Sequence, residues 1–171
     1  MSDDHVLTVG QTKSGKTLCN QALARNYKKH GIGVVVLDRM ADPNWAADWM
    51  TGNTDEFIEF IRNPDKCLQC AIFVDDSGGS LNKYVCDFDW LTTESRHHGH
   101  IAHLITQRAQ QVSLNIRSQC SKLNCFNINP KDAKIYAEDF NEPILLNASK
   151  LPKGHFYCVE RFQETRLLRM W

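Results

Sequence analysis

The chain has 171 residues, of which 42% are hydrophobic and 23% charged, and its 20 basic side chains balance its 20 acidic ones. This composition excludes a disordered chain, and a net charge of zero excludes a uniformly basic surface for nucleic acid. The longest apolar run, 33–37, is too short to span a membrane, and the acidic N-terminus is not a signal peptide. Seven cysteines in such a chain indicate reduced thiols in a soluble intracellular protein, and we expect a single domain over residues 1–171.

The first half of the chain alternates short apolar runs with helical patterns. Segment 16–29 carries apolar residues at helical spacing and basic residues in its last turn, so it predicts a helix that stops at Gly31. A second helix begins at Asn53, has acidic residues in its first turn and ends before Pro64. The apolar runs between these patterns predict buried strands at 6–9, 33–37 and 71–74.

The second half continues the alternation. Residues 88–98 predict a helix, and Pro130 suits the first position of another helix that runs to about Phe140. Strands are expected at 101–105 and 123–128, followed by an antiparallel pair at 155–159 and 165–170. This order predicts an α/β fold with a mostly parallel sheet, helices on both of its faces and a C-terminal strand pair.

A glycine-rich motif lies between the first strand and the first helix. Its pattern is G-x4-G-K-[ST], and its residues are Gly10, Gln11, Thr12, Lys13, Ser14, Gly15, Lys16 and Thr17. In this position the backbone N–H groups of the loop and the N-terminus of the helix bind a phosphate. Lys16 is therefore expected to reach the β- and γ-phosphates of ATP, and the Thr17 hydroxyl to ligate Mg²⁺.

Two carboxylates, Asp75 and Asp76, end the third predicted strand. An acid at the carboxyl end of a parallel strand lies on the same rim as the phosphate loop. Asp75 is therefore expected to orient Mg²⁺, and Asp76 to act as the general base on an attacking water. The Asp-Asp-Ser-Gly-Gly segment is also good turn chemistry, so this interpretation depends on the phosphate loop beside it.

The fourth predicted strand ends at Thr106, and Gln107 and Arg108 follow it. If this strand lies between the first strand and the strand that ends at Asp75, Gln107 emerges beside the γ-phosphate. A neutral amide there can sense whether that phosphate is present, and Arg108 can offset its charge.

Three further patterns are interpreted as ordinary packing. Cys67 and Cys70 have metal-ligand spacing, but no second cysteine pair follows, so two buried thiols are the better interpretation. His98 and His100 would need a third partner to hold a metal. Trp45 and Trp49 are four residues apart, which predicts a shared helix face.

These motifs together resemble the FtsK/HerA superfamily, and within it the genome-packaging ATPases of membrane-containing icosahedral viruses, the tectivirus-like group. The resemblance covers almost the whole chain. It rests on the phosphate loop, on Asp75 with Asp76, and on two later segments, 96–99 and 104–108, with 151–156 entering the closing strands. One departure is that the second acid of the pair, usually Glu in this superfamily, is Asp76 here.

The resemblance implies a RecA-like P-loop NTPase core that forms a pentameric or hexameric ring. It also implies ATP and Mg²⁺ as cofactors, and DNA as the substrate that is driven into a preformed capsid. Portal or other capsid-vertex proteins would be partners, and the protein would work in the host cytoplasm and at the packaging vertex of the virion. Arg96 and Arg108 are both candidates for an arginine that reaches the neighbouring subunit's site, although Arg96 equally fits a solvated helix end.

Two other functions fit parts of the sequence. A nucleoside or nucleotide kinase has the same loop and often an Asp-Arg pair such as Asp38 and Arg39, but it leaves Asp75 and Gln107 without roles. A filamentous-phage-type assembly ATPase usually carries a membrane segment. Basic side chains that could contact DNA are scattered, namely Lys13, Arg117, Lys122, Lys131, Lys150, Lys153 and Arg161.

Overall fold

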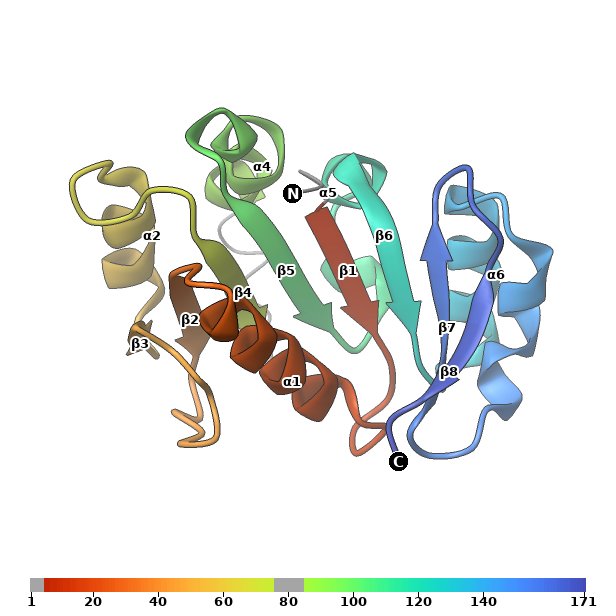
Figure 1. Ribbon diagram of the computed structural model, residues 1–171. Coiled ribbons are helices and arrows are strands. Elements are labelled where there is room, and N and C mark those ends of the chain that lie inside the picture. The colour runs from red at the N-terminus through yellow and green to blue at the C-terminus, as the bar shows by residue number, and fades with distance from the viewer. Residues whose placement is uncertain (1–4, 76–84) are drawn as a thin grey trace.

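A single mixed sheet organises the chain, with the strand order β3-β2-β4-β5-β1-β6-β7-β8 (Figure 1). The computed structural model describes residues 5–75 and 85–171. The strands are β1 His5–Val9, β2 Val34–Asp38, β3 Trp49–Thr51, β4 Ala71–Asp75, β5 Ile101–Thr106, β6 Cys120–Cys125, β7 His155–Glu160 and β8 Arg166–Arg169. Strands β1 to β6 pair in parallel, whereas β7 and β8 are antiparallel. The carboxyl ends of β1 to β6 therefore meet at one edge of the sheet.

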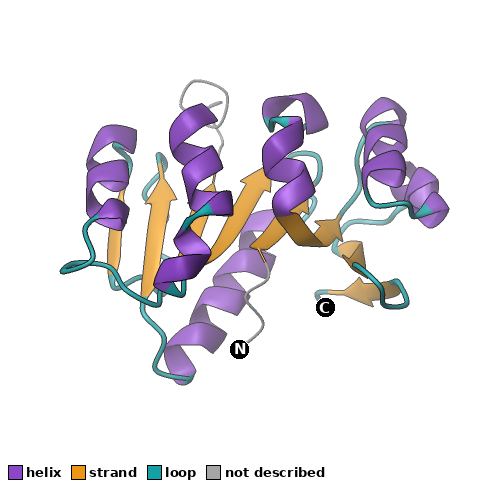
Figure 2. Cartoon of the chain, turned by 90° about the horizontal axis from the view of Figure 1, so that it is seen from above, coloured by secondary structure: helices purple, strands orange, loops and turns teal. Residues whose placement is uncertain are grey.

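The helices cover the two faces of the sheet unequally (Figure 2). They are α1 Lys16–Lys29, α2 Thr54–Arg62, α4 Val85–Thr93, α5 Leu114–Gln119 and α6 Pro130–Asp139, with 3₁₀ helices η1 Ser95–His98, η2 Ala109–Gln111 and η3 Pro143–Lys150. Helix α1 lies on one face, and α2, α4, α5 and α6 lie on the other. The expected covering of both faces is confirmed.

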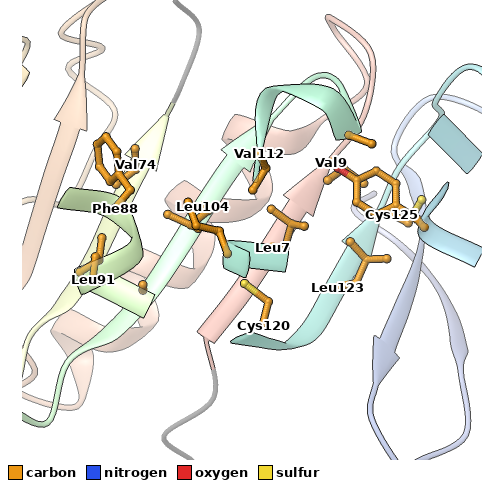
Figure 3. Close-up of a cluster of buried hydrophobic side chains, with 14 of the residues drawn as sticks. Leu7, Val9, Val74, Phe88, Leu91, Leu104, Val112, Cys120, Leu123 and Cys125 are labelled. Atoms are coloured by element: carbon orange, nitrogen blue, oxygen red, sulfur yellow. The ribbon is translucent and has the colours of Figure 1, made fainter. Parts of the chain in front are cut away.

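The larger core lies beneath the face that α2, α4, α5 and α6 cover. Successive side chains of a strand point to opposite faces, so Leu7 and Val9 of β1 point together into this core. Leu104 of β5 and Leu123 of β6 extend it on either side (Figure 3). Helix α4 adds Phe88 and Leu91, and α2 adds Phe57 and Ile61, all nearly inaccessible to solvent. Complete burial of side chains of this size contributes roughly 1.5–3 kcal/mol each to folding.

The fold prediction is confirmed, and most elements lie where they are expected. Helix α1 has the predicted bounds, and the Asn53 side chain caps α2 by accepting from the N–H groups of Asp55 and Glu56. The strand expected at 123–128 begins and ends three residues earlier, as β6. Its first half contains the polar residues Ser121 and Lys122, which obscured the strand pattern in the sequence.

One predicted helix is shorter than expected, and one predicted helix face is wrong. The helix expected to continue to residue 98 ends at Thr93 as α4 and is followed by η1. The Thr92 and Thr93 hydroxyls donate back to the carbonyl of Asp89, a contact that competes with helix continuation. Trp45 and Trp49 share no helix face, because Trp45 packs on Phe73 whereas Trp49 lies in β3 and stacks on Phe60. Within the described residues, no helix is long and apolar enough to cross a membrane.

His103 is a buried titratable group in the centre of the sheet. It lies on β5 beneath α1, is 1% exposed, stacks on Phe73 and has its Nε2 atom 3.0 Å from the Tyr27 hydroxyl. Burial, followed by the nearby charges of His5 and Lys122, lowers the pKa of His103 to about 3. Below about pH 6.5 the unfolded chain therefore takes up a proton that the folded chain does not, and the free energy of unfolding falls as the pH falls.

Replacing His103 with leucine removes this proton uptake. Between about pH 7 and pH 5 the wild-type chain loses roughly 2 kcal/mol of its free energy of unfolding through His103 alone, and H103L does not. Urea unfolding followed by circular dichroism at both pH values measures the difference. The exposed His97 offers the control, since H97L should keep the wild-type dependence of the free energy of unfolding on pH. If H103L lost as much of this free energy between pH 7 and pH 5 as the wild type does, His103 would not be the group responsible.

Candidate functional site

The phosphate loop joins β1 to α1 at the carboxyl edge of the sheet and is anchored to both neighbours of β1. The Gly10 N–H donates to the Thr106 carbonyl at the end of β5 (3.3 Å), and the Gln11 N–H donates to the Asn127 carbonyl beyond β6 (2.7 Å). The Ser14 N–H then donates to the Gln11 carbonyl (3.2 Å), which closes the loop on itself. The loop is therefore held in place by the sheet.

Two glycines allow this conformation. A Cβ atom on Gly10 would lie 2.7 Å from Phe126 Cβ and from Ser14 Oγ, so no larger residue fits beneath the loop. Gly15 caps α1 with a φ of 118°, a backbone conformation that favours glycine. The chain enters α1 so that the first N–H groups of the helix face the loop, where they suit an anion.

Lys16 lies in the first turn of α1 and is 8% exposed. Its Nζ atom donates to the Gln11 carbonyl across the loop at 3.0 Å, so the ammonium lies over the loop. Burial lowers the pKa of Lys16, and the Asp75 carboxylate opposes that shift. A phosphate in the loop would give this buried charge an anionic partner.

Thr17 and Asp75 form the second part of the site. The Thr17 hydroxyl donates to Asp75 Oδ2 at 2.9 Å, joining α1 to the end of β4. Hydroxyl and carboxylate oxygens are hard ligands that suit Mg²⁺, so the chemistry of this pair fits the ion. The two residues expected to hold the metal are thus brought together across 58 positions of sequence.

A cleft of about 290 Å³ opens beside this pair. Strand β5 lies between β1 and β4, the order on which the interpretation of Gln107 depends. Gln107 accordingly lines the cleft, and its Oε1 atom accepts a long hydrogen bond from the Thr12 hydroxyl (3.4 Å). The lining residues are Thr12, Lys13, Lys16, Thr17, Asp38, Met40, Asp42, Asp75, Ile105, Thr106 and Gln107.

Sequence reasoning missed Asp42 and gave Asp38 a place only in the kinase alternative. Asp38 ends β2 opposite Asp75 of β4, and its carboxylate accepts from the N–H groups of Met40 and Asp42 and from Trp45 Nε1. These hydrogen bonds hold the loop after β2. Hydrogen bonds from the Asn44 N–H and then from the side chains of Gln21 and Asn44 lower the pKa of Asp42. The signal in the sequence that could have indicated this part of the site is Asp38, an acid at the end of a second parallel strand, as Asp75 is at the end of β4.

The remaining predicted site residues are not all on one edge. Arg108 is exposed and lines a shallow cavity with Gln11 and Thr12, close to the phosphate loop. Arg96 lies on η1 before the start of β5, where its Nη2 atom donates to the Thr92 carbonyl and to Gln119 Oε1. A strand of six residues spans about 17 Å, so Arg96 lies far from the phosphate loop of its own chain. Asp76 lies outside the described residues.

No protein-family model matches the chain, and no curated protein sequence is similar to it. Solved structures nevertheless share its fold over nearly its whole length. The DNA-packaging ATPase B204 from Sulfolobus turreted icosahedral virus superposes with a TM-score of 0.80 at 16% identity, covering 98% of this chain and 97% of B204. B204 from Sulfolobus turreted icosahedral virus 2, in complex with AMPPCP, gives 0.79 at 16% identity and covers 99% of both chains.

A more distant structure has the same fold. VirB4 of Thermoanaerobacter pseudethanolicus gives a TM-score of 0.73 at 8% identity, covering 98% of this chain and 89% of VirB4. The resemblance inferred from the sequence motifs is therefore confirmed in the fold. The described chain is a P-loop α/β fold of the kind found in genome-packaging NTPases.

Replacing Lys16 with alanine should weaken nucleotide binding by about 10- to 150-fold, the range for removing a hydrogen bond to a charged group. Hydrolysis should be abolished, because the variant has no cation over the loop. Calorimetric titration with ATP and Mg²⁺ measures the binding. Lys28 at the other end of α1, paired with Asp48, provides the matched control, since K28A should bind ATP as the wild type does. Equal binding by K16A and K28A would contradict the assignment.

Proposed function

We propose that this protein is an ATP-hydrolysing DNA translocase that packages a viral genome into a preformed capsid. The observation that carries the proposal is the cleft in which Lys16, the Thr17–Asp75 pair and Gln107 meet. The fold supports it, because it matches the packaging NTPase B204 along both chains. Capsid-vertex or portal proteins would be the partners, and the host cytoplasm and the packaging vertex its places of action.

The proposed site residues would have separate parts in ATP hydrolysis. The phosphate loop and Lys16 would bind the β- and γ-phosphates, and Gln107 would sense whether the γ-phosphate is present. Thr17 and Asp75 would hold Mg²⁺, which when bound neutralises charge on the phosphates. Asp76 directly follows Asp75 and is proposed as the general base.

The kinase alternative has less support. Its Asp-Arg pair requires an Asp38 carboxylate that is free to bind a substrate. Asp38 lines the cleft, but it is 3% exposed and its carboxylate accepts three hydrogen bonds from its own loop. That carboxylate is therefore occupied in holding the loop that begins at Arg39.

Several basic side chains are already engaged within the fold. Arg117 pairs with Asp139 at 2.6 Å, Lys122 pairs with Glu160 at 3.3 Å, and the Arg161 guanidinium lies over the Phe140 ring. Exposed lysines remain at the start of α6 and on either side of the turn into β7, namely Lys131, Lys150 and Lys153. We propose that these three contact the DNA backbone in the ring.

DNA should stimulate ATP hydrolysis by the wild-type protein, without phosphate transfer to nucleosides. The triple variant K131A/K150A/K153A should not be stimulated but should keep basal hydrolysis. The slope of the logarithm of its DNA affinity against the logarithm of salt concentration should become shallower. The change should be about one unit for each DNA phosphate that a lysine no longer neutralises. A triple variant at Lys28, Lys29 and Lys66, away from this edge, controls for net charge. Equal stimulation of both variants would reject the surface, and phosphorylated nucleoside would reject the translocase.

Arginines acting between subunits are proposed for hydrolysis in the ring. Arg96 lies at the far edge of the sheet, so a role at a phosphate site would require the site of a neighbouring subunit, whereas Arg108 lies on the phosphate-loop edge. If Arg96 acts on the neighbour, R96A should bind ATP normally and hydrolyse it about 10³-fold more slowly.

Mixing two inactive variants tests this arrangement. Rings assembled from R96A and K16A subunits contain some interfaces with an intact loop facing an intact arginine, so part of the activity should return. Subunit exchange is verified by native mass spectrometry. If R96A and K16A do not complement each other but R108A and K16A do, Arg108 is the arginine that crosses the interface.

A further inference from the structure

The amino edge of the sheet, opposite the phosphate loop, holds a cluster of two thiols and an imidazole. Cys67 lies in the loop before β4, Cys70 directly precedes β4, and His100 directly precedes β5. One ligand atom from each of the three side chains lies within 4.8 Å of the other two, and all three side chains are buried. The sequence separates Cys70 from His100 by 30 positions, and the parallel pairing of Ala71 with Ile101 brings them side by side.

The backbone around this cluster is closely connected. The Ile101 N–H donates to the Cys70 carbonyl at 3.0 Å, and the Gln69 N–H donates to the His98 carbonyl at 3.1 Å. Gln69 has a φ of 53°, which turns the chain sharply between the two cysteines. A Cβ atom on Gly99 would lie 2.8 Å from the Gln69 side chain, so the two segments that supply the three side chains pack directly against each other.

The side chains also interact with one another. The Cys67 thiol hydrogen bonds with the Cys70 sulfur. The Cys70 N–H donates to His100 Nδ1 at 3.1 Å, which holds the imidazole against the cysteine turn. A metal ion would replace this hydrogen bond at Nδ1 or bind through Nε2. Two sulfurs and a neutral imidazole nitrogen form a borderline-soft donor set, which Zn²⁺ prefers over hard cations such as Mg²⁺.

We propose that Cys67, Cys70 and His100 bind one Zn²⁺ ion, with a water molecule in the fourth position. At zinc bond lengths of about 2.0–2.3 Å, tetrahedral ligand atoms lie about 3.6–3.8 Å apart. Because the three ligand atoms lie within 4.8 Å of one another, movements of about 1 Å bring them to these separations.

The ion would clamp the starts of β4 and β5. These two strands carry Asp75 and Gln107 at their other ends, and the neighbouring η1 carries Arg96. The role assigned to the ion is structural, so it stands whether or not the proposed DNA translocase activity is correct. A metal ion that binds the folded chain but not the unfolded chain raises the free energy of unfolding. At metal concentrations well above the dissociation constant, the increase follows the logarithm of their ratio.

Metal binding by the full-length chain tests the proposal directly. Purified protein should contain about one zinc per chain by elemental analysis. Cobalt added to metal-free protein should give the visible bands of a tetrahedral ion and a thiolate-to-cobalt charge-transfer band. Zinc should displace the cobalt and raise the melting temperature of the protein.

The variants C67S, C70S and H100A should each lower cobalt affinity at least tenfold, by about 1.4 kcal/mol or more, and abolish the zinc-dependent rise in melting temperature. Far-ultraviolet circular dichroism checks that the three variants fold. If H100A does not fold, the more conservative variant C67S carries the test. The matched controls are C158S, a half-buried thiol in β7, and H97A, an exposed imidazole on η1; both should bind as the wild type does.

Three results would overturn the site. The first is wild-type protein that shows neither bound zinc nor a thiolate band with cobalt. The second is cobalt affinity that is unchanged in C67S and C70S. The third is a Cys67–Cys70 disulfide, found by mass spectrometry in protein kept under reducing conditions. None of these readouts depends on ATP hydrolysis, so the failure of this site and the failure of the proposed function are distinguishable.

Discussion

The position of β1 between β5 and β6 is the constraint on which the site depends. Because β1 pairs in parallel with both neighbours, the loop that leaves it is hydrogen bonded to the ends of both, through the N–H groups of Gly10 and Gln11. Parallel pairing buries both faces of β1, so the strand is apolar or hydrogen bonded throughout. The loop conformation is therefore maintained by the most buried part of the sheet, and a phosphate bound there meets N–H groups already oriented by the fold.

The same sheet separates two kinds of chemistry. Its carboxyl edge gathers oxygen donors and a buried ammonium, namely Asp75, Thr17 and Lys16, which suit phosphate and a hard cation. Its amino edge gathers the sulfur and imidazole donors of Cys67, Cys70 and His100, which suit a softer ion. Strands β4 and β5 run between the two edges. A metal ion bound at the starts of these strands would limit their movement at the other ends, where Asp75 and Gln107 lie.

The arrangement of the helices also bears on assembly. In the described part of the chain, α2, α4, α5 and α6 cover one face of the sheet, whereas α1 covers the other, where it packs on Val36, Phe73 and Ile105. Arg96 and Arg108 lie at opposite edges, so a ring that uses either of them must bring a different part of one subunit against the phosphate loop of the next. In the proposed ring, the edge that contacts the next subunit would decide which arginine reaches the neighbouring phosphate site.

Local spacing in the sequence was enough to determine the phosphate loop, the acid at the end of β4 and the alternation of strands and helices. Such spacing reports directly which side of an element is buried and where a turn must form. Only the tertiary structure decided that β5 lies between β1 and β4, that Arg96 lies at the far edge, and that Cys67 and Cys70 meet His100. Strand order and register are non-local, because they are set by packing among segments tens of residues apart. A pattern of two cysteines therefore predicted only buried thiols until the pairing of β4 with β5 supplied the third ligand.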